Sequence, residues 1–242
     1  MSEPYVLRIV LRSGATFGRG VRTPSVDVET DRDPDTGLPF VRKSVVRGLI
    51  VEGCADVLYA LRERGLPSTA YEPLREAAGR LFGRPGSRAE CEGALTVGRA
   101  ELPDAYRRAV AAAVAKDADG SLVRGEALAA HATVRWSTAN DAETESAAEG
   151  TLRSSRVVHR ETAFRAPLDP GVNLHTAGEG TAGGRVERAV LGAAVAAVRR
   201  AGWRRSRGRG RLHRIEVRRG EGGDDLVGGW LNDFEDLITN RP

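Results

Sequence analysis

A segment near the C-terminus combines arginine and glycine in a pattern suited to binding an anion. Residues 202–219 hold eight arginines among eighteen residues, interrupted by Gly208 and Gly210. Glycine lets a backbone approach a phosphate closely, and a guanidinium binds a phosphate through parallel hydrogen bonds. A polyanion is therefore the first ligand to consider. The alternative is a solvated basic loop, which the end of a preceding helix also favours.

A second segment, residues 26–48, joins a carboxylate-rich loop to a helix start. A helix N-terminus favours anions, and a carboxylate beside a bound phosphate is able to hold a divalent cation or to accept a proton from a hydroxyl. For Asp31, Asp33 and Asp35 the simpler interpretation is a turn, because Asp-Pro-Asp-Thr-Gly is a turn sequence. The predicted helix start carries Arg42, Lys43, Ser44 and Arg47.

Length and composition set the frame for these segments. The chain has 242 residues, 40% of them hydrophobic, and a formal net charge of +4. This is enough for one large domain with an insertion. Nearly all the basic residues are arginine, since Lys43 and Lys116 are the two lysines. The position of an arginine is therefore more informative than the number of arginines.

Hydrophobic periodicity predicts the elements that position the two segments. Alternation predicts strands over 5–12, 94–102, 161–168 and 211–218, and helical spacing predicts helices over 43–64, 72–81, 105–115 and 185–200. The last of these helices is apolar almost all round, which predicts deep burial. Residues 137–150 are acidic and small, as in an exposed loop. The order βαββαβ is that of a ferredoxin-like α+β fold.

Other functional classes find little support. Cys54 and Cys91 form no CxxC pair, and the four histidines have no metal-ligand spacing, which predicts a reduced protein without a zinc cluster. The N-terminus does not fit a signal peptide and no apolar run is long enough for a membrane span, so we predict a cytoplasmic protein with no membrane partner. No P-loop motif occurs.

Several motifs, in order, resemble the RAMP superfamily of CRISPR-associated proteins, and most closely the backbone subunits of type III effector complexes. The segment "RDPDTGLP" (32–39) is similar to a loop that precedes the first helix of that family. The segment "RSRGRGRL" (205–212) is similar to the family's glycine-rich loop. The segments "LFG" (81–83) and "SRVVHRETA" (155–163) resemble its middle. The helix start departs from the family pattern, because Arg42 and Lys43 replace Pro-Gly.

The resemblance implies a fold and a division of the chain. It implies an α+β, ferredoxin-like (RRM-like) palm with finger and thumb insertions and a C-terminal glycine-rich loop. The whole of 1–242 is then one domain. Within it we expect a functional loop at 13–40, a thumb or finger insertion at 120–160, a glycine-rich loop at 202–210 and a C-terminal tail at 219–242.

The resemblance also implies partners and chemistry. Copies of the chain would polymerise along a guide RNA together with other CRISPR effector subunits, in antiviral defence. By register, Asp27 matches the loop aspartate that cleaves target RNA with a divalent metal, so Asp27 is the expected catalytic residue and the ligand of Mg²⁺ or Mn²⁺. The expected RNA-binding residues are Arg42, Lys43, Ser44, Arg47, Arg156, Arg160, Arg204, Arg205, Ser206, Arg207, Gly208, Arg209 and Gly210.

Other functions remain open at this point. The chain is either a metal-dependent endoribonuclease within its complex or a structural RNA-binding subunit of the same superfamily. A guide-processing endoribonuclease that uses a histidine is a third hypothesis, although the histidines are scattered. An RRM-type module that stacks bases on sheet aromatics is a fourth. It fits less well, because aromatic residues are only 5% of the chain.

Overall fold

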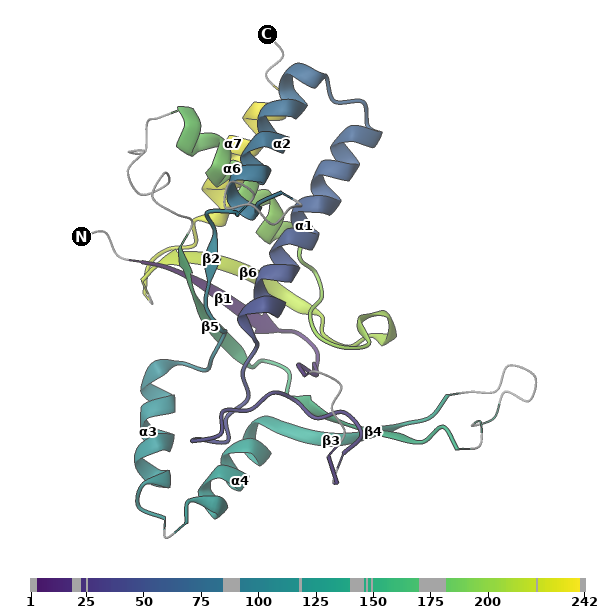
Figure 1. Ribbon diagram of the computed structural model, residues 1–242, viewed down its shortest axis with the longest axis vertical. Helices are drawn as coiled ribbons and strands as arrows, with labels where there is room; N and C mark the ends of the chain where they lie inside the picture. Colours follow the sequence, from purple (N-terminus) through teal and green to yellow (C-terminus); the bar gives the residue numbers. More distant parts are fainter. Residues whose placement is uncertain are drawn as a thin grey trace.

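The protein has an α+β fold with two antiparallel sheets, one of four strands and one of two. In Figure 1 the four-stranded sheet lies at the centre, with α1, α2, α6 and α7 above it and α3, α4 and a long β-hairpin below it. The computed structural model describes residues 4–18, 23–24, 26–84, 92–117, 119–139, 146, 148, 150–169, 182–220 and 222–239.

The central sheet has the strand order β2-β5-β1-β6, and every neighbouring pair is antiparallel. In β1 every second side chain from Tyr5 is buried, which confirms the predicted apolar face. The opposite face carries Arg8, in register with Arg165 of β5 and with Glu216 of β6. The strands are β1 (Tyr5–Leu11), β2 (Thr96–Val97), β5 (Ala163–Asp169) and β6 (Leu212–Arg219).

Four helices pack together over the apolar face of this sheet (Figure 1). The central one is α6, which contacts the other three, and its residues 187–195 are all buried, as its apolar sequence predicts. Gly53 allows close packing here, because a Cβ at Gly53 would lie 2.3 Å from the Ala194 carbonyl oxygen. The helices are α1 (Lys43–Glu63), α2 (Ser68–Phe82), α6 (Ala182–Ala197) and α7 (Val227–Thr239).

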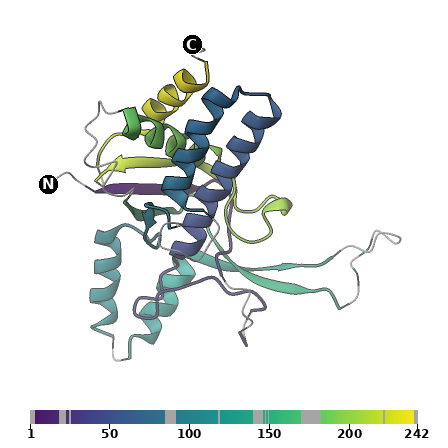
Figure 2. The ribbon, with the colours of Figure 1, turned by 45° about the horizontal axis from the view of Figure 1, so that its top comes forward.

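Between β2 and β5 the chain inserts two helices and a hairpin, which projects away from the body in Figure 2. Residues 26–30 run along one edge of this hairpin, where Val28 bridges Ser155 and its N–H donates to the Ser154 carbonyl at 3.1 Å. The long N-terminal loop is therefore attached to the insertion. The inserted elements are α3 (Asp104–Val114), α4 (Ser121–His131), β3 (Ala132–Ser137) and β4 (Arg153–Val158).

Some predicted elements differ in extent. The strand expected over 94–102 is only Thr96–Val97, with isolated bridges further on at Ala100 and Glu101. The ladder breaks where Gly98 faces Pro167, because proline has no N–H to donate. The helix expected over 72–81 begins earlier, at Ser68. The expected acidic loop over 137–150 falls mostly outside the described residues.

Four elements were not predicted, namely α4, β3, β4 and α7. Two consecutive glycines, Gly228 and Gly229, weaken the local helical signal of α7. Packing supplies its stability instead: Val227, Trp230 and Phe234 are buried, and Trp230 lies against Gly192 of α6. Tertiary contacts therefore override propensity in the segment expected to be a tail.

Candidate nucleic-acid interface

The glycine-rich loop is a closed, tightly folded turn between α6 and β6. Gly202, Gly208 and Gly210 have positive φ angles, and Arg204 also has φ 57°, which non-glycine residues seldom adopt. A Cβ at Gly210 would lie 1.8 Å from the Ala201 carbonyl oxygen. These two residues join the base of the loop, because the Ala201 N–H donates to the Gly210 carbonyl at 2.8 Å. The loop is thus held in one shape while it presents its arginines.

Two arginines of the glycine-rich loop donate hydrogen bonds to serines of the hairpin, and an arginine of the hairpin lies near them. Arg204 Nη1 donates to Ser137 Oγ at 2.8 Å, and Arg209 Nη1 donates to Ser155 Oγ at 2.7 Å. Burial lowers the pKa of Arg209, and the charges of Arg204 and Arg135 lower it further. We call Arg135, Arg204 and Arg209 the guanidinium cluster. Across the described part of the chain, none of the three forms an ion pair with a carboxylate.

The cluster has the electrostatic character of an anion site. Three like charges with no carboxylate partner among the described residues favour a negatively charged ligand. Arg207 is exposed beside it, and Gly208 is open, since a Cβ there would meet no heavy atom within 4 Å. The side chain of Ser206 lies outside the described residues. A phosphate fits such a site because guanidinium groups bind its oxygens in pairs.

Two exposed tryptophans flank the cluster in the sequence. Trp136, next to Arg135, is 63% exposed, and Trp203, next to Arg204, is 37% exposed. The Arg204 guanidinium lies 4.3 Å from the centre of the Trp203 ring. Exposed aromatic rings beside arginines are typical of surfaces that bind single-stranded nucleic acid. Sequence reasoning missed Arg135 and Trp136, and the available signal was the alternation in residues 132–137 just before the acidic segment.

The RNA-binding residues predicted at the start of α1 are of two kinds, those that are exposed and those that contact other protein groups. Lys43 and Ser44 are exposed, and the first turn contains no acidic side chain, which leaves the positive end of the helix dipole unopposed. Arg42 instead forms an ion pair with Asp31. Arg47 donates to the Phe82 carbonyl at 2.8 Å, at the end of α2.

The remaining predicted arginines also have distinct environments. Arg156 is largely buried in an ion pair with Glu29, with Nε 2.7 Å from Oε1. Arg160 is exposed in the turn that follows β4. Arg205 pairs with Glu52 of α1 at 2.7 Å. The structure therefore brings Arg204 and Arg209 together with Arg135. By contrast, Arg42, Arg156 and Arg205 each form an ion pair with a carboxylate.

Asp27 lies at the hairpin edge. Its Oδ2 accepts hydrogen bonds from the Ser154 N–H at 2.8 Å and from Ser154 Oγ at 3.0 Å. Among the residues described, no group of three or more His, Cys, Asp or Glu side chains is placed to hold a metal. A Mg²⁺ or Mn²⁺ ion at Asp27 would take phosphate oxygens and water among its other ligands, an arrangement common for Mg²⁺. The turn interpretation is confirmed for Asp33, whose Oδ1 accepts from the N–H groups of Asp35 and Thr36.

His131 and His213, two of the described histidines, make contacts outside the guanidinium cluster. His131 Nε2 lies 3.0 Å from Tyr106 Oη in a contact between α4 and α3. Burial lowers the pKa of His131, and the charge of His159 lowers it further. His213 instead pairs with Glu161, 3.1 Å away.

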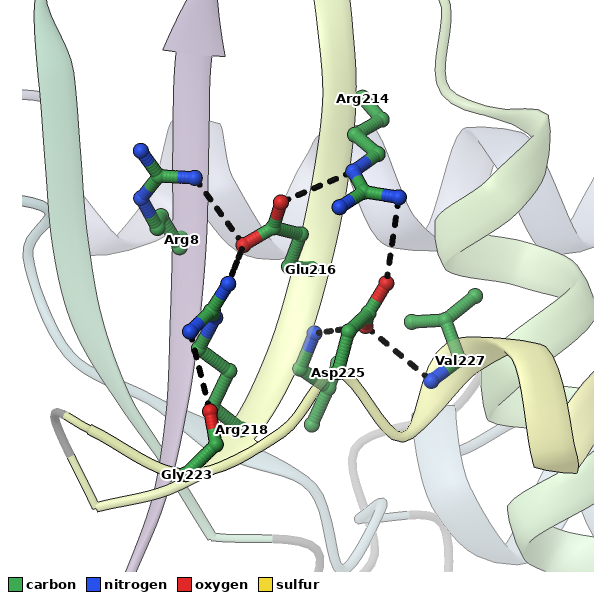
Figure 3. Close-up of polar contacts among 8 residues, drawn as sticks. Arg8, Arg214, Glu216, Arg218, Gly223, Asp225 and Val227 are labelled. Atoms are coloured by element: carbon green, nitrogen blue, oxygen red, sulfur yellow. Dashed lines mark hydrogen bonds and ion pairs between the residues drawn. The ribbon is translucent and has the colours of Figure 1, made fainter.

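A second arginine-rich region lies on the open face of the sheet (Figure 3). Three arginines surround the Glu216 carboxylate, whose side chain is only 3% exposed. Arg8 lies 3.0 Å from it, and Arg214 and Arg218 each lie 2.8 Å from it. Arg214 also approaches Asp225, which accepts hydrogen bonds from the N–H groups of Val217 and Val227. We call Arg8, Arg214, Glu216, Arg218 and Asp225 the Glu216 network.

Comparison with known proteins identifies the fold. The chain matches no protein-family model and no curated protein by sequence. It is similar to a chain in the cryo-EM structure of the Type III-B Cmr-beta bound to cognate target RNA, with a TM-score of 0.55 and 11% identity, over 96% of this chain and 99% of that one. It is also similar to a chain of the Type III-B Cmr-beta in the apo state, with a TM-score of 0.56 and 14% identity, over 91% and 98%.

These likenesses extend over nearly the whole of each chain. At such low identity they establish a fold shared with these chains of the Type III-B Cmr-beta. The resemblance expected from the sequence motifs is confirmed at that level. Among the described helices, none has the length and apolar character needed to cross a membrane.

Proposed function

We propose that this chain is a guide-RNA-binding backbone subunit of a type III-like CRISPR effector complex. The observation that carries the proposal is the guanidinium cluster, in which Arg135, Arg204 and Arg209 gather at the glycine-rich loop without a carboxylate partner in the described structure. The fold likeness supports it, because one similar chain comes from a complex bound to target RNA.

In this proposal the central sheet and its helices are a ferredoxin-like palm, and the insertion between β2 and β5 is the finger or thumb. The guide's phosphates lie along the glycine-rich loop and the exposed start of α1, at Lys43 and Ser44. Copies of the chain follow one another along the guide, beside other effector subunits, in the cytoplasm. Base pairing by the guide then reads the target sequence, as in other RNA-guided systems.

Asp27 is the residue proposed to cleave target RNA. In this reaction a ribose 2′-hydroxyl oxygen attacks the adjacent phosphorus, the Asp27 carboxylate takes the hydroxyl proton, and the 5′-oxygen of the next nucleotide leaves. The two hydrogen bonds from Ser154 fix the orientation of that carboxylate. A bound Mg²⁺ or Mn²⁺ would stabilise charge on the phosphate oxygens.

A non-catalytic RNA-binding subunit is the second candidate. It is favoured because, among the described residues, Asp27 belongs to no group of three or more His, Cys, Asp or Glu side chains placed to hold a metal. The two candidates share the guide-binding surface and differ only in whether target RNA is cut.

The first experiment is to purify the protein with its natural partners and to sequence the RNA that accompanies it. Short, uniform RNAs with a repeat-derived end are expected. Heterogeneous RNA, or no RNA, would contradict the guide-binding role.

Cleavage is then tested with Asp27→Asn in the reconstituted complex, at equal guide occupancy. Loss of cutting by Asp27→Asn, with normal cutting by Asp35→Asn in the exposed turn, is expected of the enzyme. Equal cutting by Asp27→Asn and the wild type excludes Asp27 as the catalytic residue. A wild type that holds guide and target but cuts with neither metal identifies the structural subunit.

A further inference from the structure

A cleft of about 380 Å³ lies between α1 and the glycine-rich loop. Its walls are largely apolar: Val45 and Leu49 of α1 form one side, and Phe17 and Trp203 border it from the two loops. The apolar character contrasts with the adjacent guanidinium cluster. A binding surface for phosphate alone has no need of such walls.

Gly48 leaves the backbone of α1 bare inside this cleft. A Cβ at Gly48 would have no heavy atom within 4 Å, whereas a Cβ at Gly53 would meet the Ala194 carbonyl oxygen at 2.3 Å. Gly53 is thus explained by packing between helices. Glycine weakens a helix, and nothing in the described protein requires it at position 48. The open space is suited to a flat ligand that lies directly against the helix.

One end of the cleft is polar, because Glu52 and Arg205 form an ion pair there at 2.7 Å. Both side chains are about half exposed, so their remaining hydrogen-bonding groups are accessible. A carboxylate accepts hydrogen bonds from a ring N–H or an exocyclic amine, and a guanidinium donates to a carbonyl oxygen. These are the groups that a nucleobase presents along its edge.

Trp203 connects the cleft to the guanidinium cluster. The backbone N–H of Trp203 donates to the Thr16 carbonyl at 2.9 Å, which fixes the backbone at this point. The next residue, Arg204, belongs to the cluster and lies over the indole ring. A stacking surface for a base therefore lies one residue from a phosphate-binding group, as recognition of a single nucleotide requires.

We propose that this cleft binds one nucleobase of the RNA, stacked on Trp203, lying against the backbone at Gly48 and directing its edge toward Glu52 and Arg205. The inference rests on the proposed RNA-binding function. It adds a site for a base to a surface that otherwise contacts phosphates.

The test compares two probes, a short oligouridylate and a ribose-phosphate chain of equal length without bases. The full-length wild type is expected to bind the oligouridylate about tenfold more tightly, as one stacked base allows. Gly48→Leu fills the cleft at an open helical position, and is expected to abolish this preference while leaving affinity for the abasic chain unchanged. Gly125→Leu is the control, because Gly125 is an exposed glycine within α4 with no atom near its Cβ position.

Trp203→Ala is expected to lose the preference as well, and Trp203→Phe to keep most of it, because phenylalanine still stacks. Equal binding of both probes by the wild type overturns the inference alone. Binding of neither probe contradicts the proposed function itself. If Gly48→Leu keeps the preference and changes self-association instead, the cleft receives a protein side chain and the inference is wrong.

Discussion

The guanidinium cluster and the Glu216 network contain the same kind of residue and differ in what neutralises it. Arg8, Arg214 and Arg218 converge on one buried carboxylate, whereas Arg204 and Arg209 donate to serine hydroxyls and the charges of Arg204 and Arg135 act on Arg209. Buried charge is stable when it is paired. The charges of the network are therefore neutralised within the protein, whereas the cluster has no carboxylate partner among the described residues, as the proposed anion site requires.

The cluster and the network draw on adjacent halves of one continuous stretch of sequence. Residues 202–210 supply two members of the cluster, and residues 214–218 supply most of the network. The density of arginine is similar in both halves. The position of one glutamate determines which half is neutralised within the described structure; the other half is the one proposed to bind RNA.

Removing the central carboxylate is the most severe test of this contrast. Glu216→Gln leaves three guanidinium groups without their shared partner, and is expected to lower the free energy of unfolding by about 3 kcal/mol. Urea unfolding measures this. Glu72→Gln, which removes the exposed partner of Arg75, is the matched control and is expected to change stability little. RNA affinity of the folded Glu216→Gln protein should equal that of the wild type, and a loss would place the network in the interface.

The opposite result is expected when the cluster is altered. Replacing Arg204 and Arg209 together by glutamine is expected to weaken single-stranded RNA binding by about 2 kcal/mol, roughly 30-fold. The slope of log affinity against log salt should fall by about 1.4, as two lost phosphate contacts predict. Stability should stay constant or rise, because repulsion between like charges is removed. A variant that unfolds readily would show that these arginines are structural.

Acid should affect the network selectively. Burial opposes ionisation of Glu216, but hydrogen bonds from Arg8, Arg218 and Arg214 outweigh it, so the pKa lies below its ordinary value. Since the folded state holds this proton more weakly than the unfolded state, the stabilisation is present above the ordinary glutamate pKa of about 4.3 and is lost as pH falls below it. Urea midpoints of the wild type and Glu216→Gln should converge as the pH falls below the ordinary glutamate pKa. If the urea midpoints of the two proteins instead differ by the same amount at every pH, the assigned role of Glu216 is wrong.

Single exposed arginines give the smallest and most discriminating effect. Arg207→Gln, in the glycine-rich loop, is expected to weaken RNA binding about threefold and to reduce the salt slope by about 0.7. Arg214→Gln, an exposed arginine of the network, should leave both unchanged. Equal effects of the two variants would mean that overall charge, and not a position in the glycine-rich loop, determines affinity.

The sequence by itself determined the parts of the protein that depend on local pattern. Alternating apolar residues gave β1 and β6, and helical spacing gave α1 and α6, because each period places one face toward a core. The glycine-rich loop was also predictable, since Gly202, Gly208 and Gly210 have the positive φ angles that glycine tolerates.

Only the tertiary structure decided which charges meet. Arg8 and Glu216 are 208 positions apart and become neighbours through the pairing of β1 with β6. Arg135 joins Arg204 and Arg209 because the hairpin of the insertion lies beside the glycine-rich loop. Charge pairing acts through space and leaves no periodic trace along the chain, so a local pattern cannot distinguish an arginine held by a carboxylate from one that needs a phosphate.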